Sequence, residues 1–244
     1  MLKKIVMAAA VAAAALTSAA SADMKKIRIG VEAAYPPFAE KDANGEMIGF
    51  DLDIAKAICG AMKAECVFVE QDWDGIIPGL LARKYDAIIS SMTITEERKK
   101  KIDFSKKYYH DPAKFITRKG SFTDDSPEAL AGKTIGVQRG TTHDNYVTAI
   151  YPDSTIKRYA TQDEVYLDLM AGRLDAGLAN SVALAEGFLK TDDGANYGFF
   201  GKSHSDPRYY GEGAGVAVRK GEDTLRDAFG AAITAIRGNG TYAA

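Results

Sequence analysis

Strand-like and helix-like segments alternate along this chain, and the alternation limits its fold more than any other feature. The strand-like segments occupy residues 25–31, 65–70, 85–90, 133–138, 154–160 and 174–179. The helix-like segments occupy residues 51–62, 74–84, 143–151, 162–172 and 181–190. Strands that alternate with helices build parallel sheets whose faces the helices cover. The pattern therefore predicts an α/β fold.

The two halves of the chain repeat one short pattern. GLLARKYDAIISS (79–91) lines up with DLMAGRLDAGLAN (168–180), and Ser91 then falls on Asn180. In both segments a helix ends near Arg or Lys, and a strand then runs out into a polar residue. Ligands of open α/β sheets bind beyond the carboxyl ends of the strands. We expect two lobes of similar build, with Ser90, Ser91 and Asn180 at their ligand-facing edges.

The first residues indicate export from the cytoplasm. Lys3 and Lys4 precede an apolar stretch over residues 5–16, and small residues follow, with Ala20 and Ala22 in the A-x-A positions. This order is typical of a secretory signal peptide, here residues 1–22, cleaved after Ala22. The apolar stretch is too short to span a bilayer comfortably. We therefore expect a soluble, exported protein.

Composition narrows the set of partners. Against 33 Asp and Glu the chain has 31 Lys and Arg, so its formal net charge is −2. A nucleic-acid partner requires a basic surface, and none is expected. Cys59 and Cys66 are the two cysteines, and in an exported protein such a pair favours a disulfide over a metal site. A metal would need more ligands, yet the three histidines are scattered. No metal and no cofactor is expected.

The segment IISSMTITEER (88–98) places an arginine where a cation is disfavoured. Thr95 is the expected N-cap of a short helix, with Glu96 and Glu97 in its first turn. Arg98 falls in the same turn, beside unpaired N–H groups. A bound anion would explain this position, because helix N-termini favour anions. Alternatively, Arg98 begins the solvated run RKKK and pairs with a glutamate; the segment alone leaves both interpretations open.

Other strand ends carry polar or aromatic side chains. In GVQRGTTHDNY (136–146), the N–H groups of Thr141 and Thr142 point out of a glycine turn, or Thr142 simply caps the next helix. Tyr35 and Trp73 lie in polar loops after strands. There they clamp the apolar stem of a ligand or pack under their own loops. Glu32 faces a cationic ligand group or solvent.

Beyond residue 22, the whole chain resembles the periplasmic polar amino-acid-binding proteins of ABC importers. The resemblance rests on GVEAAYPPF, GFDLDIAKAIC, VEQDWDGIIPGLLARKYDAIISSMTITEERKKKIDFS, GVQRGTTHDNY, AGRLDA, EGFLK and YYGEGAGVAVRKG, in this order. The most similar types bind lysine, arginine, ornithine or histidine, and opine-binding proteins lie nearby. The spacing of Cys59 and Cys66 also resembles that family's disulfide.

The resemblance implies a periplasmic-binding-protein fold of type II. Two Rossmann-like lobes would be joined by a hinge of two crossover strands, near residues 110–117 and 207–217. Lobe 1 is expected to hold residues 23–111 and 213–244, and lobe 2 residues 112–212 with the crossover strands. Such a protein is a monomer that captures a polar, basic amino acid in the periplasm without catalysis. It delivers that amino acid to the membrane permease of an ABC importer.

The resemblance also implies how the amino acid is held at its α-carbon. Arg98 would clamp the α-carboxylate, and the N–H groups of Ser91 and Thr142 would lie alongside. A bidentate pair of arginine and carboxylate suits this task. The Ser90 carbonyl and the Thr93 hydroxyl would receive the α-ammonium.

The ligand's side chain would extend away from these groups. Tyr35 and Trp73 would sandwich it, and Glu32 would face its distal cationic end. His143 would line the pocket beside Thr142. The bound carboxylate would also supply the anion that the position of Arg98 requires.

Asn180 departs from the family pattern, in which an aspartate pairs with the α-ammonium. An amide accepts a hydrogen bond but brings no charge, and charged hydrogen bonds are the stronger kind. An opine, which is substituted at this nitrogen, is therefore an alternative ligand, and GTTH (140–143) also resembles the opine binders. Arg139 and His143 would then meet its extra carboxylate. Otherwise Arg139 is a solvent-facing turn residue.

A further alternative is an enzyme on the same scaffold, similar to the cyclohexadienyl dehydratases. Glu32 or His143 would serve as its general acid. No sequence feature demands such a group, so a protein without catalysis is expected. Family members usually continue for a further helix with an aromatic-rich tail, whereas this sequence stops at NGTYAA. We therefore expect either that the sequence is a fragment or that lobe 1 lacks part of its packing.

Overall fold

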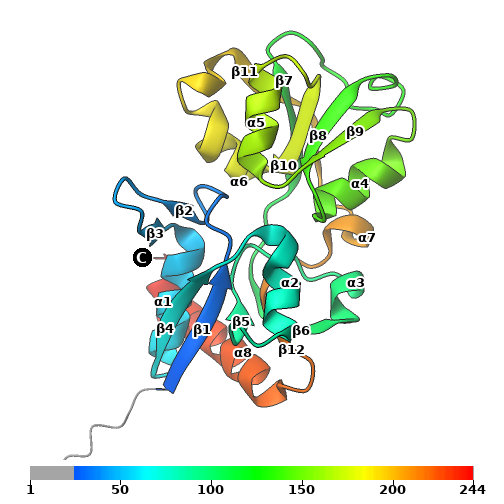
Figure 1. Ribbon diagram of the computed structural model, residues 1–244. Helices are drawn as coiled ribbons and strands as arrows, with labels where there is room; N and C mark the ends of the chain where they lie inside the picture. The colour runs from blue at the N-terminus through cyan, green and yellow to red at the C-terminus, as the bar shows by residue number, and fades with distance from the viewer. Residues whose placement is uncertain (1–24, 244) are drawn as a thin grey trace, which may run out of the picture.

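The computed structural model describes residues 25–243, so the expected signal peptide at 1–22 lies outside the described residues. The chain forms two lobes, one above the other in Figure 1, and each lobe contains a five-stranded sheet. The predicted α/β class with two lobes is confirmed. Both sheets mix parallel and antiparallel strands, which corrects the expectation of parallel sheets.

Lobe 1 has the strand order β4-β1-β5-β12-β6. Its strands are β1 (Lys25–Val31), β4 (Ala64–Glu70), β5 (Ala87–Ile88), β6 (Ile102–Tyr109) and β12 (Ala214–Arg219). β1 runs parallel to β4 and β5, whereas β12, which returns from lobe 2, runs antiparallel to β5 and β6. A small hairpin of β2 (Glu40–Lys41) and β3 (Met47–Ile48) completes the sheet structure of this lobe.

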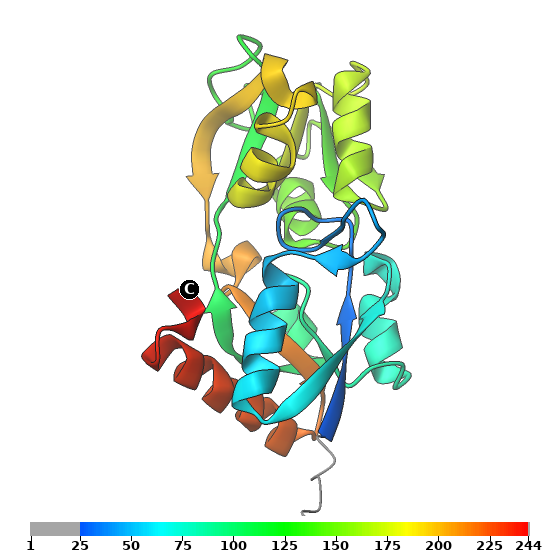
Figure 2. The same cartoon turned by 90° about the vertical axis from the view of Figure 1, so that its left-hand side faces the viewer.

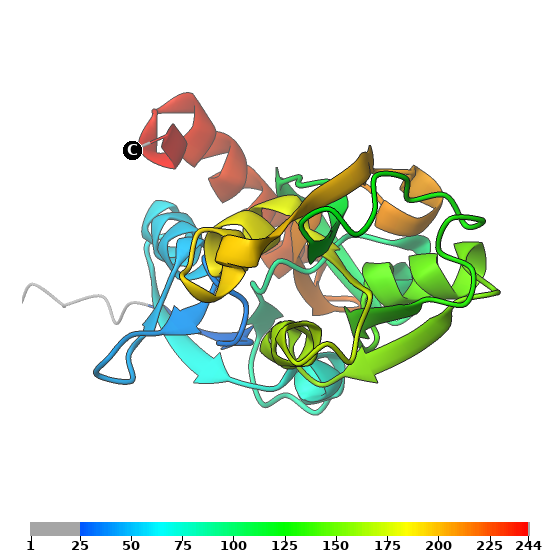
Figure 3. The same cartoon turned by 90° about the horizontal axis from the view of Figure 1, so that it is seen from above.

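Helices cover both faces of the lobe 1 sheet. Successive side chains of a strand point to opposite faces, so each face presents apolar side chains to a helix. Ile29 packs on the side of α1 (Phe50–Ala61) and α8 (Asp223–Gly238). Ile88 packs on the side of α2 (Trp73–Leu81). Viewed from above, α8 and α2 lie on opposite sides of the lobe (Figure 3). Burial of each aliphatic side chain stabilises the fold by about 1.5–3 kcal/mol. This packing holds in place the strands that end at the cleft.

Further contacts fasten α1 and α8 to lobe 1. Cys59 of α1 and Cys66 of β4 form the predicted disulfide, with an S–S distance of 2.04 Å. After α8 the chain enters the short helix η3 (Thr241–Ala243). There the Tyr242 hydroxyl donates to the Tyr108 carbonyl at 2.6 Å.

Lobe 2 has the strand order β11-β7-β10-β8-β9. Its strands are β7 (Ala113–Arg118), β8 (Thr134–Gln138), β9 (Thr155–Tyr159), β10 (Ala176–Asn180) and β11 (Tyr197–His204). β8 runs parallel to β9 and β10, whereas β7 runs antiparallel to β10 and β11. The two lobes thus share a plan, as the repeated sequence pattern predicted.

The helices of lobe 2 are α4 (Thr142–Ile150), α5 (Gln162–Met170) and α6 (Ser181–Leu184). The predicted helix at 181–190 is α-helical only in α6. It continues as the π-helix η1 (Ala185–Leu189), and the 3₁₀ turn η2 (Asp193–Asn196) follows. Gly187 lies in the π-helical part, where a Cβ would stand 2.9 Å from the Pro36 carbonyl oxygen of lobe 1.

Two connections join the lobes. The first is residues 110–112, between β6 and β7, and the second is residues 205–213, between β11 and β12, which contains α7 (Pro207–Tyr210). Figure 2 shows both as green and orange segments running between the lobes. Because the chain crosses between the lobes at these two connections, we propose that residues 112–212 form lobe 2.

Candidate ligand-binding site

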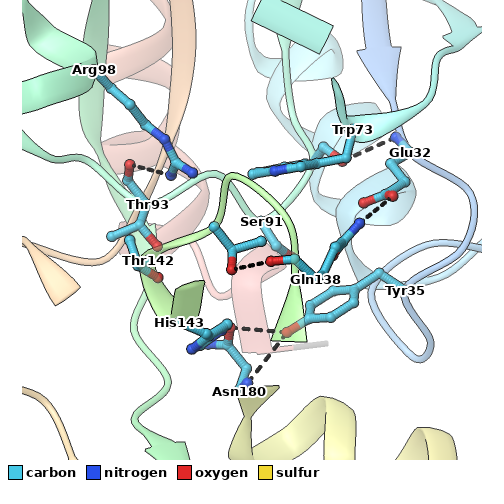
Figure 4. A pocket seen from close by; sticks show the side chains of 12 residues that line it. Glu32, Tyr35, Trp73, Ser91, Thr93, Arg98, Gln138, Thr142, His143 and Asn180 are labelled. Carbon is cyan, nitrogen blue, oxygen red and sulfur yellow. Dashed lines mark hydrogen bonds between the residues drawn. The ribbon is translucent and has the colours of Figure 1, made fainter. Parts of the chain in front are cut away.

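The carboxyl ends of four strands meet at one cavity between the lobes (Figure 4). Glu32 follows β1, Ser90 follows β5, Gln138 ends β8 and Asn180 ends β10. Strand ends of this kind are where α/β sheets bind ligands. Residues of both lobes line this cavity.

All ten residues that the sequence predicted for the site line this cavity. They are Glu32, Tyr35, Trp73, Ser90, Ser91, Thr93, Arg98, Thr142, His143 and Asn180. Gln138 and Thr141 line it as well, and the sequence analysis missed Gln138. The sequence does contain a signal for Gln138, because Gln138 is the last residue of the predicted strand 133–138. Asn180 has a similar position, directly after the predicted strand 174–179.

Arg98 lies in the short helix α3 (Glu96–Lys99), which Thr95 caps as predicted by accepting a hydrogen bond from the Arg98 N–H at 3.2 Å. The guanidinium donates to the Thr93 carbonyl at 3.0 Å and lies 5.2 Å from the centre of the Trp73 ring. Burial lowers the pKa of Arg98 to about 10, so the guanidinium remains charged at neutral pH.

No carboxylate in the described part of the chain forms an ion pair with Arg98. Its guanidinium is aimed at the cavity (Figure 4), whereas Glu96 and Glu97 are exposed. The interpretation of Arg98 as a solvated residue paired with a glutamate is therefore wrong. A half-buried cation without a counter-ion is unfavourable, and an anion in the cavity would supply one.

Ser91 holds a backbone conformation that is rare for a side chain, with φ at 50°. Its hydroxyl donates to Asp51 at 2.7 Å, and its N–H donates to the Tyr108 hydroxyl at 3.0 Å. Tyr108 in turn donates to Asp51 at 2.7 Å. Burial raises the pKa of Asp51 to about 7. This network holds the turn in place, and it occupies the Ser91 N–H that the resemblance assigned to the ligand.

The turn between β8 and α4 presents backbone groups to the cavity. The Thr141 hydroxyl caps α4 by accepting from the Asp144 N–H at 3.2 Å, so Thr141 is the N-cap rather than Thr142. Thr142 is the first helical residue and is buried at the cavity wall. The first N–H groups of a helix have no partner within the helix, so this position suits an anion.

Asn180 is held by three neighbours. Its Oδ1 accepts from the Tyr35 hydroxyl at 3.0 Å and from His143 Nε2 at 3.0 Å, while its Nδ2 donates to the Asp111 carbonyl at 3.1 Å. Burial lowers the pKa of His143 to about 4, so the ring is neutral and Nε2 carries the proton. Both lone pairs of the amide oxygen are thus engaged by uncharged donors.

Glu32 lies on the other side of the cavity and is only 5% exposed. Its N–H donates to the Ser90 hydroxyl at 3.0 Å. Burial raises the pKa of its carboxyl to about 8. Within residues 25–243, no lysine, arginine or histidine forms an ion pair with Glu32. The cavity therefore has a cation and an acid that both lack a charged partner. Trp73 lies between them, and Tyr35 lies beside Asn180 (Figure 4).

The chain matches the model of the bacterial extracellular solute-binding proteins, family 3, over residues 27–244. It belongs to this family.

Similar proteins agree with the geometry of this solute-binding protein. The chain is 49% identical to an L-arginine-binding protein of Pseudomonas aeruginosa, over 99% of this chain and 94% of the other. It is 41% identical to a lysine/arginine/ornithine-binding periplasmic protein of Escherichia coli, with the same coverage. A solved periplasmic binding protein of Salmonella typhimurium with high arginine specificity matches with a TM-score of 0.84 and 34% identity, over 90% of this chain and 96% of that chain.

These relatives are binding proteins, and the expectation of a solute-binding protein rather than an enzyme is confirmed. They give no support to the opine-receptor or dehydratase alternatives. None of the helices described in residues 25–243 is long and apolar enough to cross a membrane. Among the same residues, no group of three or more His, Cys, Asp or Glu is placed to hold a metal ion.

Arg139 of this solute-binding protein is an exposed turn residue, as one of its two expected positions had it. Its guanidinium crosses between the lobes and pairs with Asp74 of α2, with Nε 3.0 and 3.1 Å from the two carboxylate oxygens. It does not line the cavity, where a second ligand carboxylate would lie. Next to it, the Gly140 carbonyl accepts from Trp73 Nε1 at 3.4 Å. One turn of lobe 2 thus closes against lobe 1.

Proposed function

We propose that this solute-binding protein captures a cationic amino acid, foremost arginine, between its lobes in the periplasm and delivers it to an ABC import permease. The observation that carries the proposal is a pair of ionisable groups in one cavity that both lack a charged partner, the Arg98 guanidinium and the Glu32 carboxyl. An amino acid with a basic side chain carries a carboxylate at one end and a cation at the other. It is therefore complementary to both groups.

Arg98 would bind the α-carboxylate together with the N–H of Thr142, since a planar guanidinium matches a carboxylate in two parallel hydrogen bonds. The Ser90 carbonyl and the Thr93 hydroxyl would receive the α-ammonium, beside the Asn180 amide. The relatives named above for arginine, and for lysine, arginine and ornithine, support this class of ligand.

Tyr35 and Trp73 would enclose the ligand's stem, and Glu32 would receive its guanidinium. The Trp73 ring already lies against the Arg98 guanidinium, so its face would be shared between a protein cation and the ligand. Asn180 weakens the hold on the α-ammonium compared with an aspartate, because it adds no charge. We infer that Arg98 and Glu32 supply most of the selectivity.

Calorimetric titration tests this proposal. The protein would be unfolded, dialysed and refolded, because a ligand retained during purification would mask the site. Arginine, lysine, ornithine, histidine, glutamine and octopine would then be titrated separately. We expect arginine to bind with a Kd below about 1 μM, with glutamine and octopine weaker by at least about 100-fold. Octopine binding more tightly than arginine would contradict the proposal.

Scattering tests closure on the ligand. The two connections act as the hinge, and the ligand shifts the population towards the closed form. We expect the radius of gyration of the refolded protein to fall when arginine is added to saturation. An unchanged radius at saturation would argue against hinge closure, while the oligomeric state from the same data tests the expected monomer.

Delivery to a permease and export by residues 1–22 belong to the same proposal. In the source cell, deletion of the gene should reduce the uptake of labelled arginine, and the full-length chain should restore it. A version that lacks residues 1–22 should fail to restore it, because the protein would stay in the cytoplasm. Uptake that is unaffected by the deletion would contradict the transport role.

A further inference from the structure

Glu32 and Gln138 meet across the cleft from opposite lobes. Gln138 Nε2 donates to Glu32 Oε1 at 2.6 Å (Figure 4). The same nitrogen donates to the Ala160 carbonyl at 3.0 Å, within lobe 2. Both side chains are nearly inaccessible, with 5% of Glu32 and 3% of Gln138 exposed. The amide of Gln138 is therefore fixed by its own lobe and offers an N–H to the acid of the other lobe.

The charges around Glu32 are mostly of its own sign. Asp72, before α2, and Asp163, on α5, both raise the pKa of Glu32, and burial raises it most. The hydrogen bond from Gln138 has the opposite effect on the pKa, because it stabilises the carboxylate. Arg98 and the neutral His143 line the same cavity but do not pair with Glu32. Gln138 is thus the side chain that favours the charged form.

We propose that Gln138 is a positioning residue that makes the closed protein selective for a cationic ligand end, by holding the Glu32 carboxylate of the other lobe. When the lobes close, Glu32 loses water, and the Gln138 N–H replaces one of the lost hydrogen bonds. The ligand's cation supplies the remaining partner. This inference rests on the proposed function, because it concerns the charge preference of the same site.

Arginine and citrulline separate charge from shape, because citrulline replaces the guanidinium with a neutral ureido group of similar size. The ratio of their dissociation constants, measured by calorimetry, reports the charge preference. We expect Gln138→Leu to weaken arginine binding by roughly tenfold or more and citrulline binding much less, because hydrogen bonds to charged groups are the stronger ones. The ratio should therefore fall.

Arg139→Ala is the matched control. It removes another contact between the lobes from the neighbouring residue, but it does not touch Glu32. If contacts between the lobes matter only for closure, each variant should weaken the binding of arginine and the binding of citrulline by the same factor. We expect equal factors for Arg139→Ala and unequal factors for Gln138→Leu.

The pH dependence gives a second readout. Arginine binding to the wild type should weaken as Glu32 takes up a proton, and loss of the Gln138 hydrogen bond should move that midpoint to higher pH. Gln138→Asn, whose shorter amide does not reach Glu32, should shift the midpoint in the same direction. This variant keeps the test valid if Gln138→Leu does not fold.

The possible failures are distinct. A wild type that binds citrulline as well as arginine would contradict the proposed function itself. A wild type that prefers arginine, with Gln138 variants that keep both the preference and the pH midpoint, would overturn the role of Gln138 alone.

Discussion

Lobe 1 and lobe 2 contribute different chemistry to the cavity. Lobe 1 contributes the two ionisable groups, Arg98 and Glu32, together with both aromatic rings. Lobe 2 contributes neutral groups, chiefly the amides of Gln138 and Asn180 and the turn that begins α4. An open lobe 1 already carries both groups that a basic amino acid needs. Lobe 2 then replaces the water that these charges lose. We infer that lobe 1 selects the ligand by charge and that lobe 2 strengthens the selection on closing.

The largest expected effect comes from removing the charge that binds the α-carboxylate. Arg98→Ala should weaken arginine binding by roughly 1000-fold or more, because a buried ligand carboxylate would lose its counter-ion. Calorimetry measures this loss. Arg98→Lys, which keeps the charge but not the planar fork, should recover only part of it. Micromolar binding by Arg98→Ala would refute the carboxylate assignment.

Removing the other charge of lobe 1 should change which ligand is preferred. Glu32→Gln should weaken arginine binding by roughly 100-fold and leave citrulline binding nearly unchanged. The pKa of Glu32 is about 8 in the empty cavity, so binding of a cation at neutral pH should release a proton. Affinity for arginine should therefore rise as the pH approaches about 8 in the wild type and stay flat in the variant. Titrations in buffers of different ionisation enthalpy count the released protons.

A negative charge added to lobe 2 should strengthen the binding of the ligand's α-ammonium. Asn180→Asp should tighten the binding of arginine and lysine by roughly tenfold, since the α-ammonium would gain a charged partner. It should also raise the pKa of His143, whose Nε2 lies 3.0 Å from the amide oxygen. Calorimetry and the ring signals of His143 measure the two effects. No gain in affinity would mean that Asn180 does not face the amine.

The smallest effect should come from the exposed pair between the lobes. Arg139 and Asp74 are 48% and 46% exposed, and exposed pairs contribute little. Arg139→Ala should weaken arginine binding by roughly two- to fivefold, and salt should reduce the difference. In the double variant with Asp74→Ala, the two effects should not add. A 100-fold loss at high salt would mean that lobe 2 contributes more than neutral support.

The sequence was sufficient to predict the two lobes and the alternating strands and helices that lead to the cavity, but not β6, β11 or α8. The residues that it assigned to the site line one cavity. It was sufficient because the strand ends carry their functional residues within a few positions, as Ser90 and Asn180 do. The mixed sheets were not predicted, because alternation does not specify that β12 returns antiparallel after lobe 2.

Contacts between segments that are distant in the chain were also not predicted from the sequence. Gln138 meets Glu32, and Arg139 meets Asp74, only because the lobes approach each other, and no local pattern encodes that approach. Asp51 was missed for a similar reason: its two partners, Ser91 and Tyr108, are at least 40 residues away in the chain. Within a helical pattern, a buried acid of this kind looks like any exposed one.

One calorimetric experiment tests the selection by the two charges of lobe 1 most directly. Arginine, agmatine and citrulline are titrated into the refolded protein under the same conditions. Agmatine lacks the carboxylate that would meet Arg98, and citrulline lacks the cation that would meet Glu32. We predict tight binding of arginine alone, with both analogues weaker by at least about 100-fold. Either analogue binding within about threefold of arginine would contradict the role of the charge that it fails to engage.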